Sequence, residues 1–72
     1  METTTLIVNG MTCGHCVASV TEELKEVAGV RDVRVPELVK GGDSQVLVDS
    51  EGPLDLEAAR AAVVEAGYTT TV

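Results

Sequence analysis

The apolar residues of this chain follow two spacings, one typical of β-strands and the other of α-helices. Residues 3–8 are β-branched or apolar and predict a first strand. Valine-rich patterns at residues 30–35 and 45–49 predict two more strands. A β-branched stretch at residues 68–72 predicts a fourth. Gly, Pro and Asn residues separate these stretches, so each is a short element bounded by turns.

Two stripes of apolar residues recur at helical spacing. The first predicts an amphipathic helix that starts at about Cys16 and ends at Ala28-Gly29, with the glycine as a left-handed cap. Its apolar positions are Val17, Val20, Leu24 and Val27. In the second stripe, Asp55 is suited to accept hydrogen bonds from the first turn, and Gly67 ends the helix. Its apolar positions are Leu56, Ala59, Val63 and Ala66.

The elements follow one another in the order β-α-β-β-α-β. A chain of 72 residues has room for one small domain, so we expect residues 1–72 to form a single unit. This order is typical of the ferredoxin-like arrangement, in which both β-α-β halves are right-handed crossovers. We therefore predict an α+β sandwich: a four-stranded antiparallel sheet with two helices on one face. We expect the glycine-containing turn at residues 36–44 to lie at the end of the sheet away from the cysteines.

Charge and composition narrow the function classes. The chain has 5 Lys and Arg residues against 12 Asp and Glu, a net charge of −7, and its basic residues form no cluster, which argues against nucleic-acid binding. Its start carries no positive stretch and only a short apolar run, so neither a secretory signal nor a membrane span is expected. We therefore expect a cytoplasmic location without membrane insertion, where thiols stay reduced.

The two cysteines, Cys13 and Cys16, lie in the predicted loop between the first strand and the first helix. A helix start presents unpaired N–H groups and the positive end of the dipole, which favours thiolates there. Two thiolates on one loop form a soft chelate that suits Cu(I), and Gly14 between them gives the loop freedom to set their separation. For near-linear coordination we expect the sulfurs on the order of 4.5 Å apart, against about 2.05 Å in a disulfide.

Three other side chains are candidates to complete this site. His15 is a possible third ligand, but a residue beside a chelating cysteine is expected to project into solvent. Met11 carries a soft thioether, yet we expect it to pack in the core below the loop. Tyr68 is expected beside the cysteine loop, where it shields a thiolate or donates its hydroxyl to one; a core or edge position is the open alternative. A closed structural zinc site needs four protein ligands, whereas this chain offers two cysteines and one histidine, so zinc fits less well than Cu(I).

The run Gly-Met-Thr-Cys-Gly-His-Cys at residues 10–16 resembles the Met-x-Cys-x-x-Cys signature of the heavy-metal-associated domain family. The resemblance extends over nearly the whole chain, including Ala-Gly-Tyr at residues 66–68, and points to the bacterial copper chaperone type. It implies a non-enzymatic carrier in copper homeostasis and metal transport. Such a carrier binds Cu(I) and passes it to the metal-binding domain of a copper-transporting P-type ATPase by thiolate exchange. The turn at residues 36–44 departs from the family pattern by being several residues longer.

Residue by residue, the resemblance implies that Cys13 and Cys16 bind the metal. It also implies that Met11 supports the loop from the core and that Tyr68 lies next to the ligands. Thr12 stands where zinc- and cadmium-handling relatives often have an acidic residue, which favours copper for this chain.

Several alternatives stay open. A thiol-disulfide oxidoreductase can carry the same Gly-His pair between its cysteines. Against it, the chain is shorter than a thioredoxin-like domain, Thr12 replaces the usual aromatic residue, and Pro36 and Pro53 are expected on the far side of the fold. Within the metal-binding class, the alternatives are a mercury or zinc carrier and one domain of a longer P-type ATPase. Two copies sharing a metal through four cysteines would form a copper-bridged homodimer.

Overall fold

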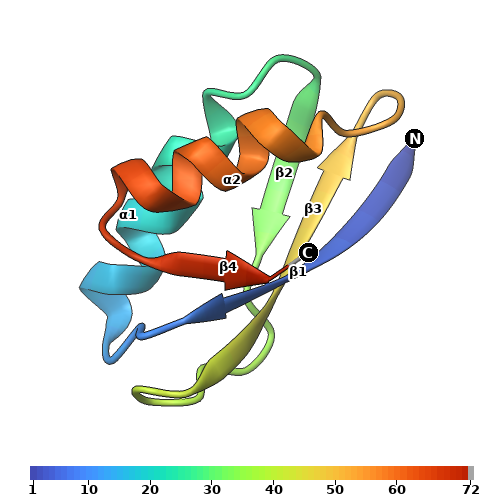
Figure 1. Ribbon diagram of the computed structural model, residues 1–72. Helices are drawn as coiled ribbons and strands as arrows, with labels where there is room; N and C mark the ends of the chain where they lie inside the picture. The colour runs from blue at the N-terminus through green and yellow to red at the C-terminus, as the bar shows by residue number, and fades with distance from the viewer. Residues whose placement is uncertain (72) are drawn as a thin grey trace.

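The computed structural model describes residues 1–71, which form a four-stranded antiparallel sheet with both helices on one face (Figure 1). The elements are β1 (Glu2–Asn9), α1 (Gly14–Lys25), β2 (Val30–Arg34), β3 (Asp43–Ser50), α2 (Leu56–Glu65) and β4 (Thr69–Thr71). The strand order is β2-β3-β1-β4, and every neighbouring pair is antiparallel. The predicted ferredoxin-like α+β fold is therefore confirmed.

The core lies between the sheet and the two helices. In the central strands, Leu6 and Val8 of β1 and Val46 and Val48 of β3 are fully buried, and they alternate with more exposed neighbours. Because the side-chain period of a strand is two, a slip of one residue would turn this apolar set outward, so burial fixes the register. The rest of the core comes from Met11, Val20, Leu24, Val33, Ala59, Ala62 and Val63.

The boundaries of α1 differ from the predicted ones. The helix begins at Gly14, earlier than expected, because Cys13 is already the N-cap residue, with an extended backbone at φ −157° and ψ 177°. The helix ends at Lys25, with Glu26 as its C-cap in the right-handed region, so the prediction of an end at Gly29 is wrong. Gly29 does have a positive φ of 86°, but it serves the turn into β2 rather than the helix cap.

The ends of α2 agree with the prediction, but one core position does not. The Asp55 carboxylate accepts hydrogen bonds of 3.1 and 3.2 Å from two amides of the first turn. Gly67 follows the helix with a φ of 94°. Leu56, expected in the apolar stripe, is 42% exposed. The last strand, β4, covers only part of the predicted stretch, and Val72 lies outside the described residues.

Three connections meet at one end of the sheet: residues 10–13 between β1 and α1 (the cysteine loop), the turn between β2 and β3, and the link from α2 to β4 (Figure 1). The prediction that residues 36–44 lie away from the cysteines is therefore wrong. The reason is strand direction: β2 and β1 are both antiparallel to β3, so they run the same way and finish at the same end. Pro36 lies at this end too, which corrects its predicted place.

Within residues 1–71, neither helix has the length and apolar character that crossing a bilayer requires.

Candidate metal centre

The sulfur atoms of Cys13 and Cys16 lie 3.7 Å apart at the start of α1. Both cysteines are free; Cys13 is exposed and Cys16 is half-buried. The separation exceeds the length of a disulfide bond, about 2.05 Å. It is somewhat shorter than the roughly 4.5 Å expected for two sulfurs on opposite sides of one metal ion. Binding one ion between the two sulfurs therefore requires this separation to widen.

Gly14 occupies the first position of α1, directly after Cys13 in the sequence. Its φ is not in the left-handed region, and a Cβ built there would meet nothing within 4 Å. Neither the backbone conformation nor the surrounding packing therefore requires glycine at this position.

The thiol of Cys16 is strongly acidified by its surroundings. Its pKa is lowered from 9.0 to about 6, chiefly by hydrogen bonding to the backbone of Thr12. The hydroxyl of Tyr68 and the hydroxyl of Thr12, whose Oγ1 is 3.6 Å from the sulfur, lower this pKa further. The same hydrogen bond raises the pKa of Tyr68, since the phenol is held as the donor to the thiolate. Cys16 is therefore largely a thiolate at neutral pH, the form that binds metals.

We expect the Cys16 thiolate of the reduced, metal-free protein to form around pH 6. Because the folded-state pKa is the lower one, ionised Cys16 favours the folded state fully above about pH 9, and this contribution is lost as the pH falls through about 6. Tyr68→Phe removes a hydroxyl that donates a hydrogen bond to the Cys16 thiolate, so this substitution should raise the pKa of Cys16. Ultraviolet absorbance of the thiolate, titrated in a Cys13→Ser background that leaves one thiol, measures both values. A midpoint at the ordinary thiol pKa would contradict the arrangement described.

Met11 and His15 take the positions that their sequence context predicts. Met11 is fully buried in the core, while the His15 side chain is exposed. Among residues 1–71, no three His, Cys, Asp or Glu side chains gather closely enough to hold a metal ion together.

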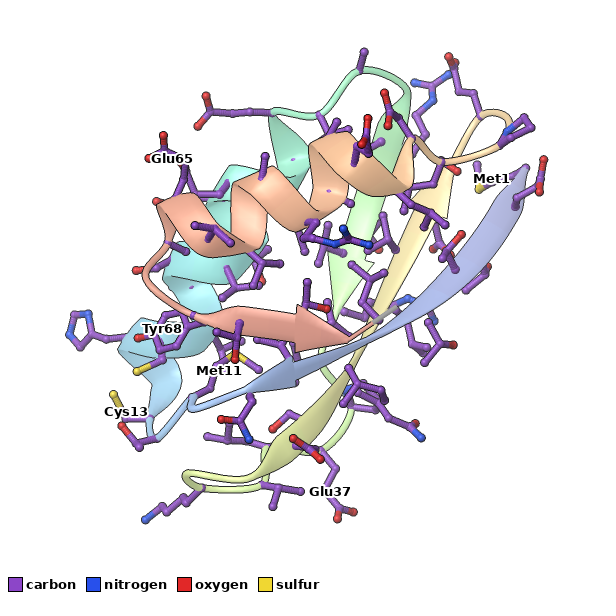
Figure 2. All side chains as sticks on the ribbon, in the orientation of Figure 1. Met1, Met11, Cys13, Glu37, Glu65 and Tyr68 are labelled. Carbon is purple, nitrogen blue, oxygen red and sulfur yellow. The ribbon has the colours of Figure 1, made fainter. Side chains whose placement is uncertain are left out.

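Tyr68 lies beside the cysteine loop, and its ring is also partly buried against the core, so the two predicted positions do not exclude each other. Figure 2 shows its ring next to the start of α1, at the same end of the molecule as Cys13. The chain passes close to this ring at Gly10, where a Cβ would lie 3.6 Å from Cδ1 of Tyr68. Gly10 also has a φ of 97°, a conformation that favours glycine, so the turn before the cysteines depends on this residue.

Sequence reasoning missed one contact of the cysteine loop. The amide of Gly41 donates a 2.8 Å hydrogen bond to the carbonyl oxygen of Met11, and the amide of Gly10 donates one of 3.2 Å to the carbonyl oxygen of Gly42. This contact could have been expected from the predicted topology, because β1 and β2 run in the same direction and the turn after β2 therefore lies at the same end of the sheet as the loop after β1.

A ferredoxin-like fold that displays two neighbouring thiols where its first strand leads into its first helix defines a small domain of the metal-binding class. The chain matches the model of the heavy-metal-associated domain family over residues 5–69, and it belongs to this family. A comparison with curated protein sequences finds no significant match.

Three solved structures illustrate the similarity. The chain is 30% identical to a CopZ metallochaperone, with a TM-score of 0.81, covering 97% of this chain and 100% of that one. It is 32% identical to the copper(I)-loaded first domain of the human copper chaperone for SOD1, with a TM-score of 0.66 and coverage of 99% and 93%. It is 27% identical to oxidised MerP from Ralstonia metallidurans CH34, with a TM-score of 0.66 and coverage of 99% and 97%.

Proposed function

We propose that this protein is a cytoplasmic copper chaperone. It binds Cu(I) through Cys13 and Cys16 and delivers the ion to the metal-binding domain of a copper-transporting P-type ATPase. The observation that carries this proposal is the pair of free sulfurs 3.7 Å apart at the start of α1, with one thiol ionised near neutral pH. The likeness to a CopZ metallochaperone and to a copper(I)-loaded chaperone domain supports it.

The donor set favours Cu(I) over zinc. Two thiolates satisfy a soft ion that accepts two-coordinate binding, whereas a closed zinc site takes four protein ligands. Cys13 and Cys16 supply two sulfurs, and Met11 is buried beneath them rather than turned toward solvent. Thr12 contributes a neutral hydroxyl near the Cys16 sulfur instead of a hard carboxylate.

Delivery follows from the exposure of the site. A two-coordinate ion leaves room for a third thiolate, so a cysteine of the partner can bind copper before a cysteine of this chain lets go. Cys13 is exposed and meets the incoming thiol, while Cys16 is half-buried and hydrogen-bonded to Thr12 and Tyr68. Copper therefore passes between proteins without release into solution. The net charge of −7 favours a partner surface of opposite charge.

A transfer experiment tests this function. The reduced, Cu(I)-loaded protein is mixed with a Cys-x-x-Cys metal-binding domain of a copper-transporting P-type ATPase, and the copper on each protein is measured after separation. We expect copper to distribute between the two proteins, and a low-affinity trap for free Cu(I) to leave this transfer unchanged. The variant with both cysteines replaced by serine should carry no copper. Delivery by exchange would be ruled out if the copper stayed on this protein, or if the trap for free Cu(I) stopped the transfer.

A further inference from the structure

The turn between β2 and β3, residues 35–42 (the β2–β3 turn), is fixed to the backbone of the cysteine loop. Gly41 donates its amide hydrogen to Met11, and Gly10 donates its amide hydrogen to Gly42, at 2.8 and 3.2 Å. These two hydrogen bonds run in opposite directions and lie just beyond the last β1–β3 pair, Asn9 and Asp43. The turn thus holds the first part of the cysteine loop through two backbone hydrogen bonds.

The β2–β3 turn is anchored in turn by Ser44, a fully buried residue of β3. The Ser44 hydroxyl accepts a 2.9 Å hydrogen bond from the amide of Val39 and lies 3.4 Å from the Val39 carbonyl oxygen, to which it donates. The turn is also tightly packed, since a Cβ on Gly42 would lie 2.8 Å from Cγ1 of Val39. One buried hydroxyl therefore ties the middle of the turn to the sheet.

Met11 is consequently held on two sides. Its side chain is fully buried in the core, and its carbonyl oxygen accepts the hydrogen bond from Gly41. The residue lies two positions before Cys13, and the cysteine loop enters α1 at Gly14. The start of the loop is thus fixed by the β2–β3 turn and its end by the helix, and Thr12 and Cys13 form the short segment between these two points.

We propose that the β2–β3 turn is a brace that positions the cysteine loop for its metal ion, with Ser44 as the positioning residue. The metal side of this inference rests on the proposed function. When the brace is intact, Met11 holds the start of the cysteine loop in place, and the Cys13 sulfur stays close to that of Cys16. When the brace is loosened, the loop samples wider separations of the two sulfurs, and a bound Cu(I) is released faster.

The chain offers a matched pair of variants for testing the brace. Ser44→Ala removes the hydroxyl that anchors the β2–β3 turn. Ser50→Ala removes an equally buried hydroxyl near the other end of β3, where Ser50 is 2% exposed and donates a 2.6 Å hydrogen bond to the carbonyl oxygen of Gly52. Both substitutions delete a buried serine hydroxyl that ties down a turn, but only the first acts at the end that carries the cysteines.

Two rates report on the brace: amide hydrogen exchange at residues 12–16 in the reduced, metal-free protein, and Cu(I) release to a chelator. Loss of one net hydrogen bond corresponds to roughly fivefold in an equilibrium constant. We therefore expect Ser44→Ala to raise both rates about three- to tenfold, with exchange in the central strands β1 and β3 unchanged. Ser50→Ala should leave both rates at their original values.

A backbone substitution gives a second, more local measurement. Replacing the Gly41 amide by an ester in a chemically assembled chain removes only the donor to Met11 and should reproduce the effect of Ser44→Ala. The same replacement at Gly52, whose amide donates no hydrogen bond within residues 1–71, is the control.

Equal acceleration by both serine variants, or none by Ser44→Ala and the Gly41 ester, would overturn the brace. The two proposals also fail separately. If the unmodified protein does not hold Cu(I), the proposed function is lost, while amide exchange in the metal-free protein still decides whether the turn positions the loop.

Discussion

Replacing either Cys13 or Cys16 with serine should lower the affinity for Cu(I) by more than about 100-fold. A serine hydroxyl keeps its proton at neutral pH and is a hard donor, so it replaces neither the charge nor the softness of a thiolate. Removing a side chain that merely orients a metal ligand already costs about 10–100-fold in affinity. Loss of one of two direct ligands must cost more. Competition of each reduced variant against a Cu(I) chelator measures the effect.

His15→Ala is the control for these variants. The imidazole lies in the first turn of α1, next to Cys16 in sequence, but it is exposed, and we place it outside the metal's ligands. Its removal should change the Cu(I) affinity by severalfold at most. A loss as large as that of the serine variants would make His15 a third ligand and would contradict a site of two sulfurs.

Met11→Ala should destabilise the folded protein by about 2–5 kcal/mol, the usual cost of emptying a buried methionine site. The side chain is fully buried in the core beneath the cysteine loop. A domain of 72 residues has roughly 4–11 kcal/mol of total stability, so this single change removes a large part of it. Urea unfolding of the reduced, metal-free protein measures the free-energy difference.

Met11→Leu separates the packing role of this residue from metal binding. Leucine nearly conserves the buried volume, so the free energy of unfolding should change by less than about 1.5 kcal/mol. The Cu(I) affinity should also stay the same, because a fully buried thioether supports the loop without touching the ion. If Met11→Leu kept its stability but lost copper binding as the cysteine variants do, the thioether would be a ligand.

The strands and the cap of α2 can be predicted from sequence because their signals are local. Alternating burial around Leu6 and Val8 and the side-chain hydrogen bonds of Asp55 depend on neighbours a few positions away. The end predicted for α1 lies too far along the chain for a related reason. Val27 continues the apolar period and packs against the core, but it does so from the turn after the helix. Periodicity records which residues are buried, and burial does not require that the helix continue.

In the candidate site too, some features can be predicted from the sequence and others cannot. The cysteines and Tyr68 carry distinctive side chains, so the residue types alone indicate their chemistry. The contacts of the β2–β3 turn have no such signal, since Gly41 and Gly42 bind the cysteine loop through backbone atoms alone. Backbone contacts leave no pattern in the residue types and form only where strand directions bring distant segments together.

Selection of a soft monovalent ion by two thiolates is the central claim, and a competitive titration of the reduced protein with Cu(I) and Zn(II) against a colorimetric chelator tests it most directly. We expect Cu(I) to bind tightly and an excess of Zn(II) to leave it in place, with binding lost when both cysteines are serine. Displacement of Cu(I) by Zn(II), or equal preference for the two ions, would contradict the claim.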